Sequence, residues 1–354
     1  MNEMRPIAAI AELGRRLTRL GARPLDALRT DPPAEFHGRI CSGLARRVTR
    51  RGGQVLVLLI AGADSSCLIQ TSAASDQGGA RADQSPGANP SARAKSDEAG
   101  ETRVTNSFGA VLVRIAPGEF LMGSPESESG RTHHEGPQHR VRLTKTYYLG
   151  ETEVTQAQWK SVMGSDGTPS PYAGDDLPVS GVTWQEAVDF CRKLSERPEE
   201  RSAGRVYRLP TEAEWEFACR AGTSTPFSFG ETIDSDQANY DADFIYGTGK
   251  KGLTRQRPCP CGSLPANAWG LREMHGNAWE WCSDFYSRDT YSARVDSANQ
   301  VQVDPTGPPG GMAYVVRGGA WSSNPAEIRS ASRTNYGPTY RQVLVGLRLC
   351  MDAP

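Results

Sequence analysis

Two stretches near the C-terminus of this 354-residue chain carry the side chains best suited to chemistry. The first, LREMHGNAWEWCSDFY, arranges Glu273, Glu280 and Asp284 around a Gly-Asn turn. Carboxylates and turn carbonyls are the oxygen ligands that Ca²⁺ prefers, and Trp279 and Trp281 would shield such a loop from water. The spacing fits a calcium site, and it also fits unrelated surface acids.

The second stretch, VVRGGAWSSNPAEIRSASR, covers residues 315–333. It combines a glycine pair, a tryptophan, small hydroxyls and three arginines, which is a composition typical of a site. Such a set can support catalysis or binding, and the residue types alone do not separate the two.

Other reactive side chains form weaker patterns. His133, His134 and His139 lie close together, but no second His or Cys cluster at ligand spacing accompanies them, so we expect a solvated turn. Cys259 and Cys261 are one residue apart and lack a partner pair, which argues against a zinc ribbon. The sequence contains no phosphate-binding loop, HExxH motif or GxSxG motif.

The composition narrows the class of protein. The formal net charge of −1 gives no electrostatic basis for binding nucleic acid. With 37 glycines and 24 prolines, the chain is rich in turns, which favours an irregular, loop-rich α+β fold over a helical bundle.

The sequence divides into three regions. Residues 1–69 include a signal-like apolar run near residues 54–62, preceded by arginines and followed by small residues. This run is too short to span a bilayer, and its order predicts export to the periplasm or beyond, with a start site assigned too early; a buried strand is the alternative. Residues 70–107 are poor in large apolar residues and predict a disordered linker, and residues 108–354 predict the folded domain.

Local signals within the domain predict its elements. Alternating apolar residues indicate strands in FGAVLVRIAPGEFLMGS and HRVRLTKTYYL, and a last strand in VLVGLRLC. Capping boxes predict three helices, which begin after Thr155, Thr183 and Thr211.

The ordered motifs resemble one known family. GEFLMGS, EGPQHRVRL, ETEVTQAQW, LPVSGVTWQEAVDFC, YRLPTEAEWEFACRAG, NAWGLREMHGNAWEWCSD, VVRGGAWSS and VGLRL occur in the order seen in formylglycine-generating enzymes, also called sulfatase-modifying factor domains. The resemblance covers about residues 108–352 and implies an irregular α+β fold like that of C-type lectins.

The resemblance implies several site residues. Structural Ca²⁺ would bind the side chains of Glu273 and Glu280 and the carbonyls of Gly276 and Ala278, although the family usually has Asp or Asn at the first position. A disulfide would join Cys191 to Cys350, and a second would start at Cys219 but meets Ser330 at its partner position.

The enzymes of this family oxidise a sulfatase cysteine with O₂ and Cu(I), which two cysteines hold. Those positions match Ser323 and approximately Ile328 here, and neither a hydroxyl nor an isoleucine suits Cu(I), so copper is not expected.

The resemblance therefore predicts an exported, non-oxidase binding or accessory module for a protein or peptide ligand, with no nucleic-acid partner and no membrane span. Its binding face would use aromatic, Asn and Arg side chains of the C-terminal part, which are common recognition groups. The candidates are Trp279, Trp321, Asn324, Arg329, Arg333, Asn335, Tyr336 and Tyr340. The alternative is a formylglycine-generating oxidase, active in sulfatase activation, whose atypical site uses displaced cysteines such as Cys259 or Cys261.

Overall fold

The structure is a computed structural model that describes residues 101–164, 169–295 and 300–353. The predicted signal-like run and residues 70–100 of the predicted linker lie outside these ranges. In chain order the elements are β1 (Arg103–Thr105), β2 (Val111–Ile115), β3 (Gly118–Met122), η1 (His133–Glu135), β4 (His139–Leu143), β5 (Tyr147–Gly150), α2 (Gln156–Met163), α3 (Trp184–Ser195), α4 (Pro198–Ser202), β6 (Tyr207–Arg208), α5 (Glu212–Arg220), β7 (Trp279–Phe285), α6 (Thr290–Arg294), β8 (Gln302–Val303), β9 (Tyr314–Arg317), β10 (Arg333–Tyr336), β11 (Val345–Gly346) and β12 (Cys350–Asp352).

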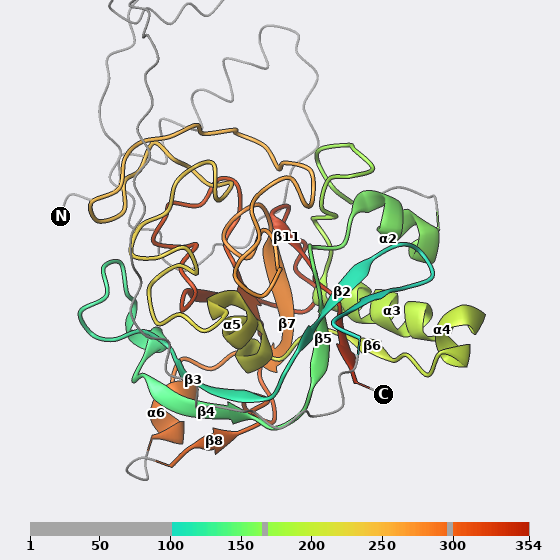
Figure 1. Cartoon of the computed structure of the whole chain (residues 1–354), viewed down its shortest axis with the longest axis horizontal. Coiled ribbons are helices and arrows are strands. Elements are labelled where there is room, and N and C mark those ends of the chain that lie inside the picture. Colours follow the sequence, from blue (N-terminus) through green and yellow to red (C-terminus); the bar gives the residue numbers. More distant parts are fainter. Residues whose placement is uncertain (1–100, 165–168, 296–299, 354) are drawn as a thin grey trace, which may run out of the picture. The chain divides into compact units, whose positions relative to one another are not determined.

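Short strands form three sheets (Figure 1). The alternating patterns predicted strands in the segments that form β2, β3, β4 and β5. One sheet has the order β1-β2-β5-β12-β6, a second β10-β9-β7-β11, and a third β3-β4-β8. Helices α2, α3 and α4 lie on one side of the domain, and α5 lies beside β7 (Figure 1). No helix in the described ranges has the length and apolar character needed to cross a membrane.

The three predicted capping boxes are all present. The hydroxyls of Thr155, Thr183 and Thr211 each accept a backbone N–H three residues on, and the side chain at that position bonds back. This reciprocal pairing satisfies N–H groups that the first helical turn leaves without partners. Helix α5 ends one residue before Ala221, whose φ of 46° places it in the left-handed region.

The structure corrects two sequence predictions, one about the last strand and one about where the linker ends. The predicted last strand is two strands, because β11 pairs with β7 and β12 pairs with β5 and β6 in a different sheet. The predicted linker also extends too far, since β1 pairs with β2 and buries Val104 within the core. The folded domain thus begins before residue 108.

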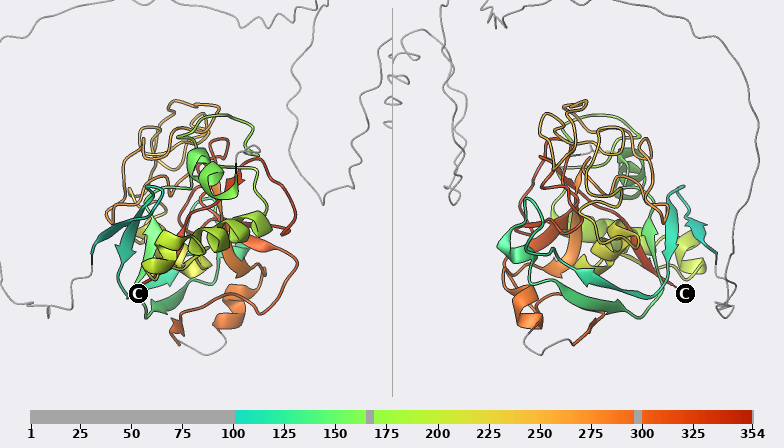
Figure 2. Two further views of the ribbon diagram at one scale, coloured as in Figure 1. Left: turned by 90° about the vertical axis from the view of Figure 1, so that its right-hand side faces the viewer. Right: turned by 60° about the vertical axis from the view of Figure 1, so that its left-hand side comes forward.

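Between α5 and β7 the chain runs for residues 221–278 without a helix or a strand (Figure 2). This segment has its own apolar cluster, which includes Phe227, Tyr240 and Tyr246 and receives Ile328 from the C-terminal part. Two further clusters fill the space around the sheets and helices. Side-chain packing rather than strand pairing therefore holds the loops beside the C-terminal stretch.

Candidate functional site

The C-terminal stretch is a tight excursion between β9 and β10. Gly318 and Gly319 have φ values of 94° and 79°, a region in which most side chains are strained. A side chain at Gly319 would also overlap Ile328. The glycine pair turns the chain away from β9 so that it returns through β10, which pairs antiparallel with β9.

The two residues that the resemblance matched to copper ligands, Ser323 and approximately Ile328, have structural roles. Ser323 is 5% exposed; its Oγ accepts the N–H of Ala320 at 3.2 Å and its carbonyl accepts the N–H of Asp241 at 2.9 Å. Ile328 is fully buried among aromatic side chains. These residues do not fit Cu(I), because neither supplies a sulfur or nitrogen ligand.

Three of the predicted binding residues lie in the interior instead of on a surface. The guanidinium of Arg329 donates two hydrogen bonds to Glu135, at 2.7 and 2.8 Å, and is 1% exposed. Arg333 donates two hydrogen bonds of 2.7 Å to Glu212, and Trp279 is buried in β7. The sequence placed these side chains on the binding face because their buried partners lie far away in the chain.

The other predicted binding residues are at least partly exposed. Trp321 packs edge-on against Tyr172, with 5.7 Å between ring centroids. The rings of Tyr336 and Tyr340 stack at 5.4 Å, and Tyr340 is 54% exposed. Asn324 and Asn335 are half-buried.

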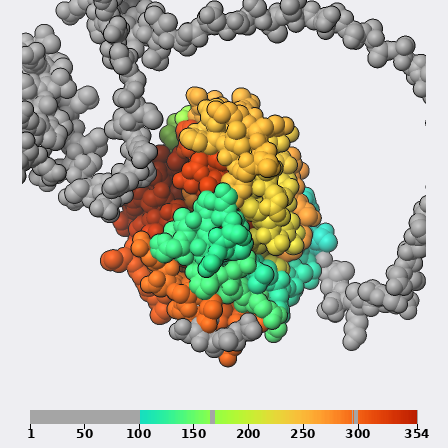
Figure 3. Space-filling model, turned by 90° about the vertical axis from the view of Figure 1, so that its left-hand side faces the viewer, coloured from blue at the N-terminus to red at the C-terminus, as the bar shows by residue number. Residues whose placement is uncertain are grey.

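A hollow of about 330 Å³ lies next to Asn324, and its lining includes residues that sequence reasoning missed. Residues 322 and 324–327 form one wall, and Ser129 and residues 244–247 form the other. Phe244 and Ile245 are each more than half exposed there, and two adjacent large apolar residues in a polar, glycine-rich loop were the available signal. In Figure 3 the red C-terminal segment reaches the surface between the green and yellow segments that supply the opposite wall.

The predicted calcium ligands have other partners. The Glu280 carboxylate accepts Arg348 Nη2 at 2.7 Å, Arg348 Nε at 2.9 Å and Trp215 Nε1 at 2.7 Å. Glu273 accepts the N–H groups of Gly262 and Leu264, each at 3.1 Å. Because the Arg348 guanidinium already neutralises Glu280, a Ca²⁺ ion would bind Glu280 only if it displaced this ion pair. No group of three His, Cys, Asp or Glu side chains within the described ranges is placed to hold a metal. Calcium binding through Glu273, Gly276, Ala278 and Glu280 stays a prediction.

The described cysteines are free thiols. Cys191 and Cys350 are both buried but are not joined, so the structure lacks the disulfide that the resemblance implied. Cys219 Sγ lies 3.6 Å from Ser330 Oγ, which places the serine where that family bridge would end. Burial raises the pKa of the Cys259 thiol to about 11. Burial, followed by the charges of Glu153 and Glu273, holds the pKa of Cys261 well above its usual value.

One group of buried side chains ties the loops to the sheets. Asn277 is fully buried, with its Nδ2 donating to Glu153 Oε1 at 3.0 Å and its Oδ1 accepting the Cys259 N–H at 2.9 Å. Its carbonyl accepts the N–H of Trp321 at 3.0 Å. Asn277 therefore connects the C-terminal stretch to the loop of residues 221–278.

Comparison with known proteins identifies the family. Residues 97–353 match the model of the sulfatase-modifying factor enzyme 1-like domain, and the chain belongs to this family. The fold is accordingly the loop-rich, C-type-lectin-like α+β fold.

The relatives have different names and lengths. The chain is 31% identical over 252 residues to serine/threonine-protein kinase pkn1 of Chlamydia caviae, which covers 64% of this chain and 35% of that protein. It is 31% identical over 208 residues to the formylglycine-generating enzyme of Bos taurus, covering 56% and 50% of the two chains. The enzyme of the same name from Streptomyces coelicolor is 28% identical over 321 residues, covering 75% and 95%. The chain thus spans only a third to a half of the kinase and of the bovine enzyme.

Solved structures support the fold. The structure of PvdO from Pseudomonas aeruginosa matches with a TM-score of 0.57 and 26% identity, over 71% of this chain and 98% of that chain. Treponema denticola variable protein 1 matches with a TM-score of 0.58 and 23% identity, over 72% and 100% of the chains, and supports the fold alone.

Proposed function

We propose that this protein is a non-oxidase member of the sulfatase-modifying factor family that binds a protein or peptide through its C-terminal surface. The observation that carries the proposal is what Ser323 and Ile328, the residues that the resemblance matched to the copper ligands, contact in the structure. Ser323 is engaged in backbone hydrogen bonds and Ile328 fills an apolar cluster, so the framework is kept while the thiolates are absent.

The oxidase alternative receives no support from the displaced cysteines. Copper(I) binds thiolates, and a thiol must lose its proton to become one. The pKa of Cys259 is raised to about 11 by burial, and that of Cys261 is raised by burial beside Glu153 and Glu273. Without a bound metal ion both thiols are therefore protonated at neutral pH, and a copper ion would have to displace these protons.

The binding surface that the structure supports differs from the predicted one. It uses the predicted residues that are at least partly exposed, and it adds Phe244 and Ile245, which line the hollow opposite Asn324. The predicted residues kept are Trp321, Asn324, Asn335, Tyr336 and Tyr340. Exposed aromatic and apolar side chains beside amide groups are frequent at protein interfaces. Export stays part of the proposal, because arginines, an apolar run and small residues follow one another ahead of the folded domain.

The non-oxidase assignment and export are tested separately. Titration with Cu(I) in a competing chelator, followed by mass spectrometry of a cysteine-containing sulfatase peptide, should show neither thiolate binding nor formylglycine. Tight copper binding with peptide oxidation would overturn the non-oxidase assignment. A mass spectrum of the mature N-terminus from expressing cells tests export, and an intact Met1 on secreted-fraction protein would count against cleavage.

The surface is tested by partner capture with matched variants. Trp321→Ala should lose the partners that the wild type retains, whereas Val303→Ala, an exposed apolar residue on β8, should retain them. Equal capture by both variants would remove Trp321 from the binding face.

A further inference from the structure

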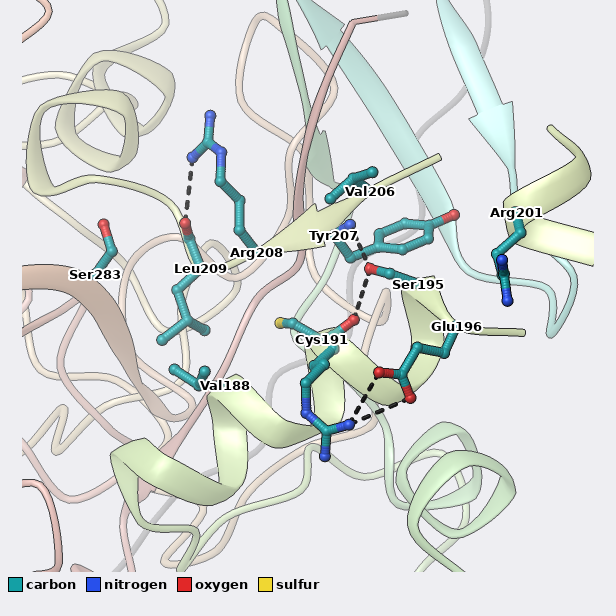
Figure 4. A pocket seen from close by; sticks show the side chains of 11 residues that line it. Val188, Cys191, Ser195, Glu196, Arg201, Val206, Tyr207, Arg208, Leu209 and Ser283 are labelled. Atoms are coloured by element: carbon teal, nitrogen blue, oxygen red, sulfur yellow. Dashed lines mark hydrogen bonds and ion pairs between the residues drawn. The ribbon is translucent and has the colours of Figure 1, made fainter. Parts of the chain in front are cut away.

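A pocket of about 420 Å³ opens between α3 and β6, a volume within the range of small-molecule sites (Figure 4). Val188 and Cys191 of α3 face Val206 and Leu209 around it. No residue of this pocket belongs to the proposed binding surface, so the site is separate from the function proposed above.

The pocket wall presents few free polar groups. Ser195 Oγ donates to the carbonyl of Cys191 at 2.8 Å and accepts the N–H of Tyr207 at 2.8 Å, so the hydroxyl is used within the wall. Burial raises the pKa of the Cys191 thiol to about 12, which keeps it neutral. A wall of this kind, with few free donors away from its rim, holds water poorly and favours an apolar occupant.

The rim carries charge that is only partly compensated. Arg192 pairs with Glu196 at 3.0 Å, and Arg208 makes two hydrogen bonds of 2.7 Å to Glu214. Arg201, on α4, lines the pocket but has no carboxylate partner among the residues that the structure describes. The guanidinium of Arg201 is therefore the charge at this rim that is available to a ligand.

The rim also exposes apolar surface. Val206 is 64% exposed immediately before β6, although its side chain borders the pocket. A ligand with an aliphatic chain would cover this side chain and the wall behind it, while an anionic end would reach Arg201. Burial of the aliphatic chain and one charge-assisted hydrogen bond to Arg201 would then both contribute to the binding free energy of this ligand.

We propose that this pocket binds a small aliphatic carboxylate, with the chain between α3 and β6 and the carboxylate on Arg201. Octanoate is a suitable probe, and octan-1-ol is its uncharged counterpart. The full-length protein should show saturable octanoate-dependent shifts of the methyl NMR signals of Val188, Val206 and Leu209.

The variants separate the two parts of the proposal. Arg201→Gln should weaken octanoate binding about tenfold, the effect of losing one charge-assisted hydrogen bond, and should leave octan-1-ol binding unchanged. Lys193→Gln removes an exposed cation of α3 that does not line the pocket, and it should leave octanoate binding within about twofold. Val188→Trp should fill the pocket and abolish binding while the remaining methyl spectrum stays dispersed.

Several results would overturn the proposal. Octanoate could fail to shift the three methyl signals saturably below its micelle concentration. Equal weakening by Arg201→Gln and Lys193→Gln would show general attraction to a basic surface. Octan-1-ol that binds as tightly as octanoate would exclude the role of Arg201.

Discussion

At the scale of single residues, Glu280 has two interpretations that an experiment can separate. The family resemblance makes it a calcium ligand, whereas the structure pairs it with the buried Arg348. Glu280→Ala would leave that guanidinium buried without its carboxylate, and removing one partner of a buried ion pair costs about 3–5 kcal/mol of unfolding free energy. We expect the same loss in EDTA and in CaCl₂, measured by urea unfolding.

The control for this prediction is Glu119→Ala, which removes an exposed carboxylate paired with Arg140 and Arg142 and should change stability little. A loss seen for Glu280→Ala only when Ca²⁺ is present would instead identify Glu280 as a ligand.

The buried ion pair of Arg329 and Glu135 should make the stability of the protein depend on pH. Burial raises the pKa of Glu135, but hydrogen bonds and charge from Arg329 outweigh burial, and the pKa is lowered below 4.5. A carboxyl with a lowered folded pKa contributes stability above its unfolded pKa, and this contribution is lost as pH falls through the folded pKa. Glu135→Gln should therefore be less stable than the wild type at pH 6 by about 3 kcal/mol, with a smaller difference at pH 3.5.

Urea unfolding of both proteins at the two pH values checks the prediction. Since glutamine does not titrate, the wild type should lose more stability than the variant on acidification. A difference that stays constant between pH 6 and pH 3.5 would show that folding does not shift the pKa of Glu135.

At the scale of elements, β1 tests where the domain begins. Val104 is 8% exposed and belongs to the core cluster around α3, although the sequence assigned it to a disordered linker. Val104→Ala in the full chain should lower the unfolding free energy by about 1–2 kcal/mol, because buried methyl groups are lost. Thr105→Ala changes an exposed residue of the same strand and is the control. Equal stability of the two variants would show that β1 does not belong to the folded domain.

Elements determined by local sequence could be predicted, and those determined by distant partners could not. The capping box of Thr183 needs only Glu186, three residues away, so the pattern alone located α3. The separation of β11 from β12 depends on pairing with strands far back in the chain, which periodicity cannot show.

The same reason explains the errors in the candidate site. Arg329 pairs with Glu135 across 194 positions and Arg333 with Glu212 across 121, so the sequence offered two arginines without visible partners. The match of Ser323 and approximately Ile328 to the family's copper-ligand positions rests on the resemblance and stays a prediction.

At the scale of the whole molecule, one framework serves proteins of different names. The same domain matches proteins named as kinases and as formylglycine-generating enzymes, and this chain covers very different shares of them. The shared fold therefore does not by itself define an activity, and in this chain part of the proposed surface lies on the segment of residues 221–278. How firmly that segment is attached to the sheets and helices decides whether the proposed surface is preformed.

Asn277 provides the test of that attachment. Its Nδ2 bonds to Glu153, and its Oδ1 accepts from Cys259 at 2.9 Å and from Asn239 at 3.1 Å, all in the interior. Asn277→Ala leaves buried partners unsatisfied, at about 1–3 kcal/mol each, and places alanine at a φ of 63°. We expect a loss of at least about 3 kcal/mol and faster amide hydrogen exchange throughout residues 221–278, beyond the change in β9. If the exchange of β9 and of this segment accelerated equally, the loops and sheets would form one cooperative unit, and the surface around Trp321 would be as rigid as the core.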